Sequence, residues 1–212
     1  MRTPIKKTVK VERTKILSNI NSYFYPGNTS VSQKFIYLIG EVDMAICETL
    51  LKEIITYNTV EFDVDVTGKK IKKPHIDVIN MIINSSGGDM DAAIGLITIM
   101  EASIIPIRTI AVGDCSSAAL FILMAGDQKV VAPLTSILSH QFSTVAEGTF
   151  NNIRSTLKEF TTYNEKMTLL YQKYTGLSRD VIEKELMTSD DVFLTPEQAL
   201  QYNICNIISN LV

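Results

Sequence analysis

Two adjacent serines, Ser116 and Ser117, lie where a serine could act as a nucleophile. An apolar run ends at Gly113, four small or polar residues follow, and an unbroken apolar run begins at Ala118. This pattern predicts a strand, a tight turn and a buried helix, with a hydroxyl presented at the end of the strand. Serines also cap helices in ordinary strand-to-helix turns, so the pair alone does not establish catalysis.

A serine attacks a carbonyl group only when a base removes its proton and a carboxylate orients that base. His140 is the candidate base, because it directly follows an apolar, strand-like run. The other histidine, His75, lies beside Pro74 in a charged segment and is expected at the surface. Asp190 and Asp191 precede a capped helix and are both candidate orienting carboxylates, and their spacing alone leaves the choice between them open.

The backbone N–H groups of Gly88 and Ala118 are the candidate donors to an oxyanion. Gly88 ends a turn of small residues, 84–88, and has no side chain that would block its N–H. A glycine pair ahead of a helix can also bind phosphate. However, no Walker lysine follows this pair, and Asp89 would repel a phosphate group.

The composition is that of one globular domain. The chain has 212 residues, of which 46% are apolar and 20% charged, and its formal net charge is −3. This charge gives no reason to expect a nucleic-acid partner. No apolar run reaches the roughly 18 residues that span a bilayer, and no apolar core follows the N-terminal lysines as in a signal peptide. We therefore expect no membrane partner.

Disulfides and a metal site are not expected either. The cysteines are odd in number and widely spaced without a CxxC pair, which indicates buried thiols in a reducing, cytoplasmic compartment. With two histidines, a histidine-based metal site has few ligands to use. The three cysteines are Cys47, Cys115 and Cys205.

The elements that must position these side chains alternate along the chain between strands and helices. This order predicts an α/β fold with a mainly parallel sheet. Strands are expected at 34–39, 78–83, 107–112, 130–131 and 137–138, and helices at 41–57, from 89, at 118–125 and at 151–175.

Local signals mark the remaining boundaries. Gly176 closes the long helix, Ser178 caps a short one, and Thr195 begins a capping box. A charged hairpin or loop is expected at 58–76, and an irregular basic arm at 1–32. Ligands of parallel sheets bind at the carboxyl ends of the strands, where both small-residue turns and His140 are predicted to lie.

Four motifs, in this order, resemble the Clp protease proteolytic subunit family. The similarity extends from about residue 34 to residue 208. The motifs are Asn84-Ser-Ser-Gly-Gly88, Gly113-Asp-Cys-Ser-Ser117-Ala-Ala, Ser139-His140-Gln141 and Asp191-Val-Phe-Leu-Thr-Pro-Glu-Gln-Ala199.

The resemblance implies a serine peptidase without a cofactor of its own. Ser117 would be the nucleophile, His140 the general base and acid, and Asp191 the orienting carboxylate. Gly88 and Ala118 would supply the oxyanion N–H groups, and no metal would be needed.

The resemblance also implies a fold and an assembly. The domain at 33–212 would have the ClpP/crotonase-like fold of repeated β-β-α units, with the helix at 151–175 as a protruding handle that packs two rings of seven subunits face to face. Such a particle degrades unfolded polypeptides that a partner AAA+ unfoldase feeds to it, and only the unfoldase uses ATP.

Three other functions stay open. A phage-type maturation protease of the same fold would cut capsid or scaffold chains without an unfoldase. A non-catalytic ring subunit would join active paralogues, which fits Asp190, because many members have an arginine there that acts between rings. A crotonase-type acyl-CoA enzyme would leave Ser117, His140 and Asp191 unexplained.

Overall fold

A mainly parallel sheet forms the centre of the protein, as expected from the alternating strands and helices. The computed structural model describes residues 32–59, 62–64, 66–72 and 75–209. The expected arm at 1–32 therefore lies, apart from Ser32, outside the described residues. The sheet has the order β1-β4-β5-β6-β9, and each neighbouring pair in this order is parallel. The five strands are β1 (Gln33–Ile39), β4 (Val78–Ser85), β5 (Ile107–Ser116), β6 (Gln128–Val131) and β9 (Ile207–Ile208).

Two further strands extend the sheet beyond the end of β5. β7 (Ser136–Ser139) pairs in parallel with the last residues of β5, and β8 (Val192–Leu194) pairs antiparallel with β7. β5 thus has β6 as its neighbour in its first half and β7 in its second half. This change of partner brings the end of β5 beside the end of β7, where the candidate nucleophile and base were predicted.

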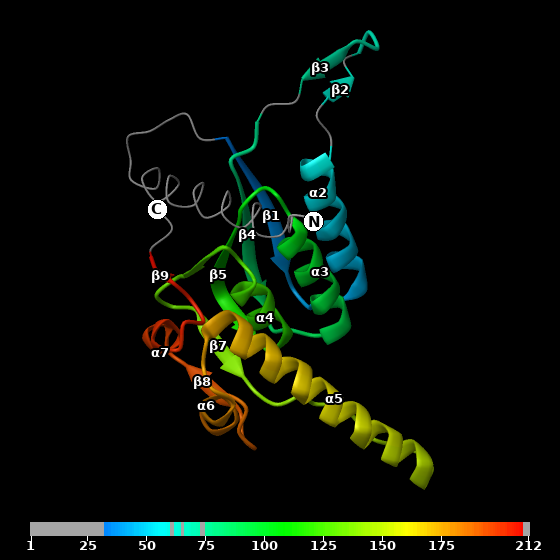
Figure 1. Cartoon of the computed structure of the whole chain (residues 1–212), viewed down its shortest axis with the longest axis vertical. Coiled ribbons are helices and arrows are strands. Elements are labelled where there is room, and N and C mark those ends of the chain that lie inside the picture. The colour runs from blue at the N-terminus through cyan, green and yellow to red at the C-terminus, as the bar shows by residue number, and fades with distance from the viewer. Residues whose placement is uncertain (1–31, 60–61, 65, 73–74, 210–212) are drawn as a thin grey trace, which may run out of the picture.

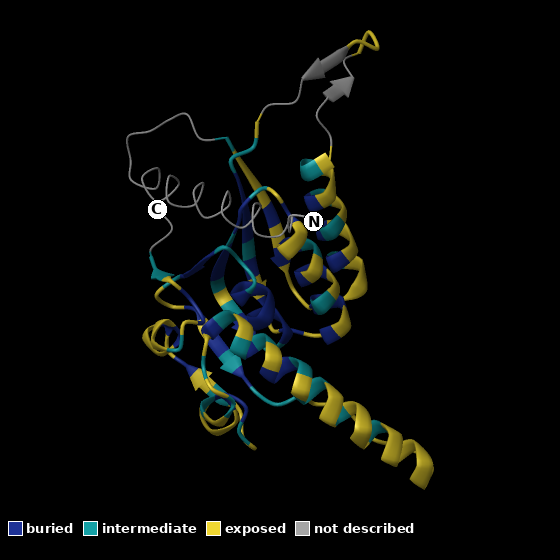
Figure 2. Cartoon of the chain, in the orientation of Figure 1, coloured by how far each residue is buried: buried dark blue, intermediate teal, exposed yellow. Residues whose placement is uncertain are grey.

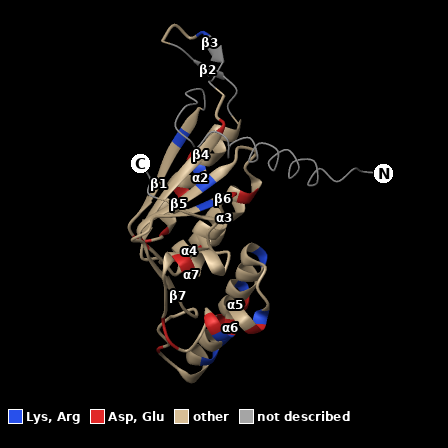
Figure 3. Cartoon of the chain, turned by 90° about the vertical axis from the view of Figure 1, so that its left-hand side faces the viewer, with Lys and Arg blue, Asp and Glu red and all other residues tan. Residues whose placement is uncertain are grey.

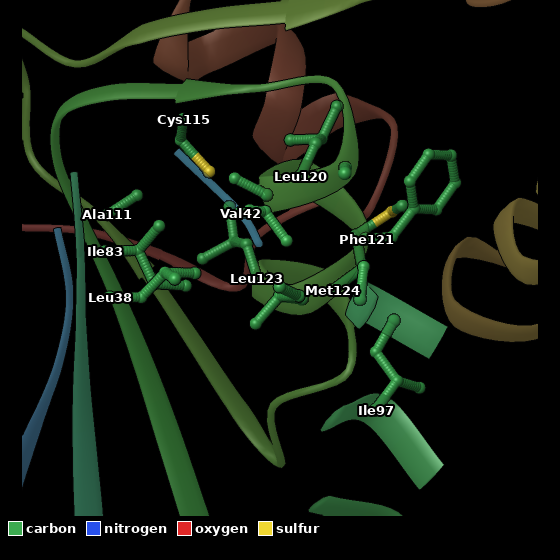
Figure 4. Close-up of a cluster of buried hydrophobic side chains, with 14 of the residues drawn as sticks. Leu38, Val42, Ile83, Ile97, Ala111, Cys115, Leu120, Phe121, Leu123 and Met124 are labelled. Atoms are coloured by element: carbon green, nitrogen blue, oxygen red, sulfur yellow. The ribbon is translucent and has the colours of Figure 1, made fainter. Parts of the chain in front are cut away.

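The helices cover the sheet and form one hydrophobic core with it. α2 (Met44–Thr59) and α3 (Met90–Ala102) lie side by side, and α4 (Ala118–Met124) packs against α3 (Figure 1). All seven residues of α4 are buried, as a helix that is apolar all round requires. Its Leu120 and Leu123 lie in the same cluster as Leu38, Ile83 and Ala111 of the strands (Figure 4). The core therefore rigidly supports the turn that precedes α4.

Two predicted boundaries were wrong. The strand expected to stop at Gly113 continues to Ser116, because a register shift after Ile83 lets the chain pass Gly113 (φ 72°) and resume pairing at Cys115. The helix expected from residue 41 begins at Met44, and no acidic residue lies in its first turn. Asp43 instead precedes it, and its carboxylate accepts the Ile46 N–H at 2.8 Å.

The local signals in the second half of the chain are confirmed. Gly176 ends α5 in the left-handed conformation (φ 77°). Ser178 caps α6 (Arg179–Glu185), and Thr195 and Gln198 form the capping box of α7 (Pro196–Gln201). The hairpin expected within 58–76 is β2 (Phe62–Val64) paired antiparallel with β3 (Lys70–Lys72). This hairpin and the free end of α5 lie at opposite ends of the molecule (Figure 1).

The expected long helix is α5 (Phe150–Thr175), which has 26 residues and is therefore about 39 Å long. Its second half packs on the core through Met167 and Tyr171, whereas its first half projects away from the domain (Figure 2). Three apolar side chains on this projecting half, Phe150, Ile153 and Leu157, are 76%, 39% and 60% exposed. They recur at helical spacing and form one unpartnered stripe within the described protomer.

Charged side chains gather on α5 and α6, while the strands of the sheet carry few (Figure 3). The three cysteines are buried free thiols, as predicted. Within the ranges that the structure describes, no helix combines the length and apolarity needed to cross a membrane.

Candidate active site

Ser117 forms a sharp elbow between β5 and α4. Its backbone has φ 54° and ψ −124°, a conformation that costs a non-glycine residue about 1–3 kcal/mol. The surrounding hydrogen bonds hold it there: the Ser117 N–H donates to the Leu138 carbonyl of β7 at 2.9 Å, and the Ser117 carbonyl accepts from Leu120 N–H. The elbow lifts the hydroxyl out of the strand and away from the buried helix.

The turn at 84–88 packs directly against this elbow. A Cβ atom on Gly87 would lie 2.6 Å from the Ser117 Cβ and 2.7 Å from the Ser116 carbonyl oxygen. Gly87 also has φ 94°, which a side chain disfavours. On the other side of the turn, Asn84 Oδ1 accepts the Asp114 N–H at 3.0 Å and fixes the irregular part of β5. The sequence indicated a turn of small residues here but did not indicate these two contacts.

The structure distinguishes Ser117 from its neighbours. Ser116 is 5% exposed, and its hydroxyl donates to Asp114 at 2.5 Å. Cys115 is completely buried, and this burial raises the pKa of its thiol, so it stays protonated and unreactive. Ser117 is the one residue of the three whose side chain lines a pocket.

His140 contacts Ser117 directly. The distance between His140 Nε2 and Ser117 Oγ is 2.7 Å, a hydrogen bond across 23 residues of sequence. The residues on either side of His140 are anchored: Ser139 Oγ donates to the Leu186 carbonyl at 2.6 Å, and Gln141 Nε2 donates to the Met187 carbonyl at 2.9 Å. The predicted nucleophile and base are therefore brought together on a rigid support.

Asp191 lies on the segment beside His140 but does not contact its ring. The last pair of β7 and β8 joins Ser139 to Val192; His140 directly follows Ser139, and Asp191 directly precedes Val192. Among the described residues, no hydrogen bond joins these two side chains, and Asp191 is exposed. Asp190 belongs to a local turn in which its N–H and carbonyl both bond to the Thr188 hydroxyl.

The two predicted oxyanion donors border the same pocket. Val42 forms an isolated parallel β-bridge with Gly88 and holds it in place. The Val42 N–H donates to the Gly87 carbonyl and the Val42 carbonyl accepts from the Asp89 N–H, both at 2.7 Å. In the described part of the chain, neither the Gly88 N–H nor the Ala118 N–H has an acceptor. Both groups are therefore available to a bound oxyanion.

The pocket itself is small, about 50 Å³, and its lining combines polar and apolar residues. The polar residues include the serine and the histidine. Apolar side chains complete the lining, and one of them, Phe142, stands only two residues after His140. The lining residues are Gly88, Met90, Ser117, Ala118, His140, Phe142, Ser143 and Met167.

Across the described ranges, no cluster of three or more His, Cys, Asp or Glu side chains is arranged to bind a metal ion. The pocket contains one histidine and no carboxylate among its lining residues.

Comparison with known proteins agrees with this geometry. The sequence pattern of the Clp protease family matches residues 29–210, a range that contains every lining residue of the pocket. Over 187 residues the chain is 26% identical to the ATP-dependent Clp protease proteolytic subunit 2 of Mycobacterium bovis, and the match covers 86% of this chain and 80% of that protein. The match covers the body of the domain and not merely the site motifs, so this chain belongs to the Clp protease family.

Proposed function

We propose that this chain is a serine endopeptidase in which Ser117 is the nucleophile and His140 the general base. The observation that carries the proposal is the 2.7 Å contact between His140 Nε2 and Ser117 Oγ at a strained elbow. A serine needs this contact to lose its proton as it attacks, and the contact joins residues from two different strands.

The reaction follows from the positions of these groups. Ser117 Oγ attacks the carbonyl carbon of the scissile peptide bond, and its proton passes to His140 Nε2. The Gly88 and Ala118 N–H groups donate to the oxyanion that forms. His140 then protonates the leaving amine, which breaks the C–N bond and leaves an acyl-enzyme. A water molecule, deprotonated by His140, releases the acid and restores Ser117.

Asp191 is the proposed orienting carboxylate. Support comes from the β7–β8 pairing, whose last pair is Ser139 with Val192, so that His140 directly follows one paired residue and Asp191 directly precedes the other. Its exposed side chain is free to rotate toward His140 Nδ1, and catalytic hydrogen bonds commonly tighten only once substrate is bound. The proposed chemistry uses no metal and no cofactor of the chain's own.

The proposed working form is a pair of stacked rings. Support comes from the projecting half of α5, whose apolar stripe has no partner within the described protomer. Apolar stripes of this kind mark protein–protein contacts. In the proposed cytoplasmic particle, fourteen subunits (two rings of seven, the arrangement that the family resemblance implies) enclose a chamber, and an AAA+ unfoldase supplies unfolded polypeptides at the cost of ATP.

Peptidase assays of the purified full-length chain test this proposal. The expected result is cleavage of a short fluorogenic peptide by the chain alone, with a stably folded protein degraded only when an AAA+ unfoldase and ATP are added. A correctly sized particle that cleaves no peptide would contradict it. Cleavage of a capsid scaffold protein without an ATPase would favour a maturation protease. Co-purification with a second, active subunit would favour a non-catalytic ring component.

A further inference from the structure

Phe142, one of the apolar residues that line the pocket, is held in place by the long helix α5. The Phe142 ring stacks on the Tyr163 ring with 4.3 Å between the centroids and 13° between the planes. The Phe142 N–H donates to Asn164 Oδ1 at 2.8 Å. Both the side chain and the backbone of Phe142 are thus attached to neighbouring positions of α5.

Tyr163 is in turn hydrogen-bonded to the first turn of α3, which also contributes to the pocket lining through Met90. The Tyr163 hydroxyl donates to the carboxylate of Asp91, the second residue of α3. Lys166 flanks this pair, with its Nζ 3.7 Å from Asp91 Oδ1 and 4.4 Å from the centre of the Tyr163 ring. The hydrogen bond to Asp91 raises the pKa of Tyr163 to about 12, because the protonated hydroxyl is the form that donates to the carboxylate.

These contacts form a latch around the pocket, defined here as Asp91, Tyr163 and Phe142. α3 begins at Met90, which lines the pocket and stands two residues after Gly88. Phe142 lines the pocket from the segment that follows β7, two residues after His140. The latch therefore connects Phe142 to the first turn of α3, and both segments contribute residues to the lining of a small cavity. A rotation of the Phe142 ring away from the pocket would have to break its stacking with Tyr163.

We propose that Tyr163, tied to Asp91, is a positioning residue that holds Phe142 against the substrate. Phe142 thereby restricts the pocket to aliphatic side chains, such as leucine, and disfavours aromatic ones at the residue beside the scissile bond. A held ring both narrows the cavity and leaves an apolar surface for an aliphatic side chain to contact. This inference rests on the proposed peptidase activity.

The chain contains a matched control for this latch. Tyr174 also lies on α5, and its hydroxyl donates to the carboxylate of Glu101 near the end of α3, with Lys173 paired to the same carboxylate. The two tyrosines thus join the same pair of helices in the same way. Only the Tyr163 contact reaches a residue that lines the pocket.

The test compares kcat/KM for two fluorogenic peptides that differ only in leucine or phenylalanine before the scissile bond. The wild-type chain is expected to prefer the leucine peptide. Phe142→Ala is expected to reduce that preference about tenfold or more, the usual discrimination from a change of this size in an apolar pocket. Tyr163→Leu should shift it in the same direction, and Tyr163→Phe, which keeps the stacking ring, by a few-fold. Tyr174→Phe should leave it unchanged.

Labelling of Ser117 by a fluorophosphonate separates this inference from the peptidase proposal. Each variant is expected to be labelled at Ser117, which shows that the fold and the nucleophile are intact, and Tyr174→Phe, which lies outside the pocket lining, is expected to react at the wild-type rate. Labelled Phe142→Ala protein with an unchanged leucine preference would overturn the inference alone. An equal shift in Tyr174→Phe and Tyr163→Phe would also overturn it, because the effect would then come from the helix as a whole. A wild-type chain that is not labelled would overturn both proposals.

Discussion

Ser139 pairs with Val192 where β7 ends and β8 begins. His140 directly follows Ser139, and Asp191 directly precedes Val192. The pairing thus places the proposed orienting carboxylate on the chain segment beside the proposed base, without a direct contact between their side chains. We predict that Asp191→Asn lowers kcat by roughly 10²- to 10⁴-fold, because an amide no longer stabilises the charged imidazole. Steady-state peptide hydrolysis measures this loss. Asp190→Asn, its neighbour in a local turn, is the control, and an equal loss there would contradict the assignment.

A side chain at Gly87, which packs against Ser117, is predicted to destabilise the protein. In Gly87→Ala, the new Cβ would collide with Ser117 Cβ and the Ser116 carbonyl in a backbone with φ 94°. We expect unfolding to become easier by at least about 2 kcal/mol, together with a slower reaction of Ser117 with fluorophosphonate.

Gly95→Ala provides the comparison for that variant. Gly95 lies within α3, and its added Cβ would meet no atom within 4 Å. Removing a glycine from a helix interior should stabilise the protein by about 0.5–1 kcal/mol and leave labelling unchanged. Thermal unfolding of both variants measures the contrast, and equal stability of the two would refute the proposed packing of Gly87.

The apolar stripe on α5 is predicted to hold two rings together. In Leu157→Glu, a charge replaces a side chain that is 60% exposed in the protomer and would be buried between rings. The particle mass measured by light scattering should therefore fall to that of a single ring. Ser155→Glu places the same charge on the other side of α5, where Ser155 is exposed, and should leave the mass unchanged. A full-sized Leu157→Glu particle would exclude the stripe from the contact.

Alkaline stability is predicted to depend on Cys47. Burial, followed by the charges of Asp43 and Asp89, raises the pKa of its thiol from 9.0 to about 11. Between these values the unfolded chain has released the proton and the folded chain still holds it, so the free energy of unfolding falls as the pH rises.

Urea unfolding between pH 9 and pH 11 measures this effect. Over that range, the free energy of unfolding of Cys47→Ala should fall less steeply than that of the wild type, by up to about 1.4 kcal/mol per pH unit. A variant with the same alkaline slope as the wild type would show that Cys47 does not contribute.

Local patterns predicted the fold well where neighbours in sequence decide the structure. The all-apolar α4, the left-handed Gly176 and the Thr195 capping box each depend on a few adjacent residues, and all were confirmed. The end of β5 was not predicted, because its path past Gly113 depends on Asn84, thirty residues earlier in the chain.

The site was predicted to a similar extent. The order of the motifs singled out Ser117 and His140, which the structure places in contact. The Tyr163–Asp91 hydrogen bond spans 72 residues and depends on how α5 crosses α3, which periodicity alone does not specify. In the sequence, Tyr163 is only one more aromatic residue on a long helix.

The most direct test of the proposed nucleophile is fluorophosphonate labelling of the intact chain, with the modified residue identified by peptide mass spectrometry. The reagent should attach to Ser117, and Ser117→Ala should abolish both labelling and peptide cleavage. Ser116→Ala removes only a buried hydroxyl that bonds to Asp114 and should still be labelled. Labelling that persists in Ser117→Ala, or that maps to Ser116, would contradict the proposed mechanism.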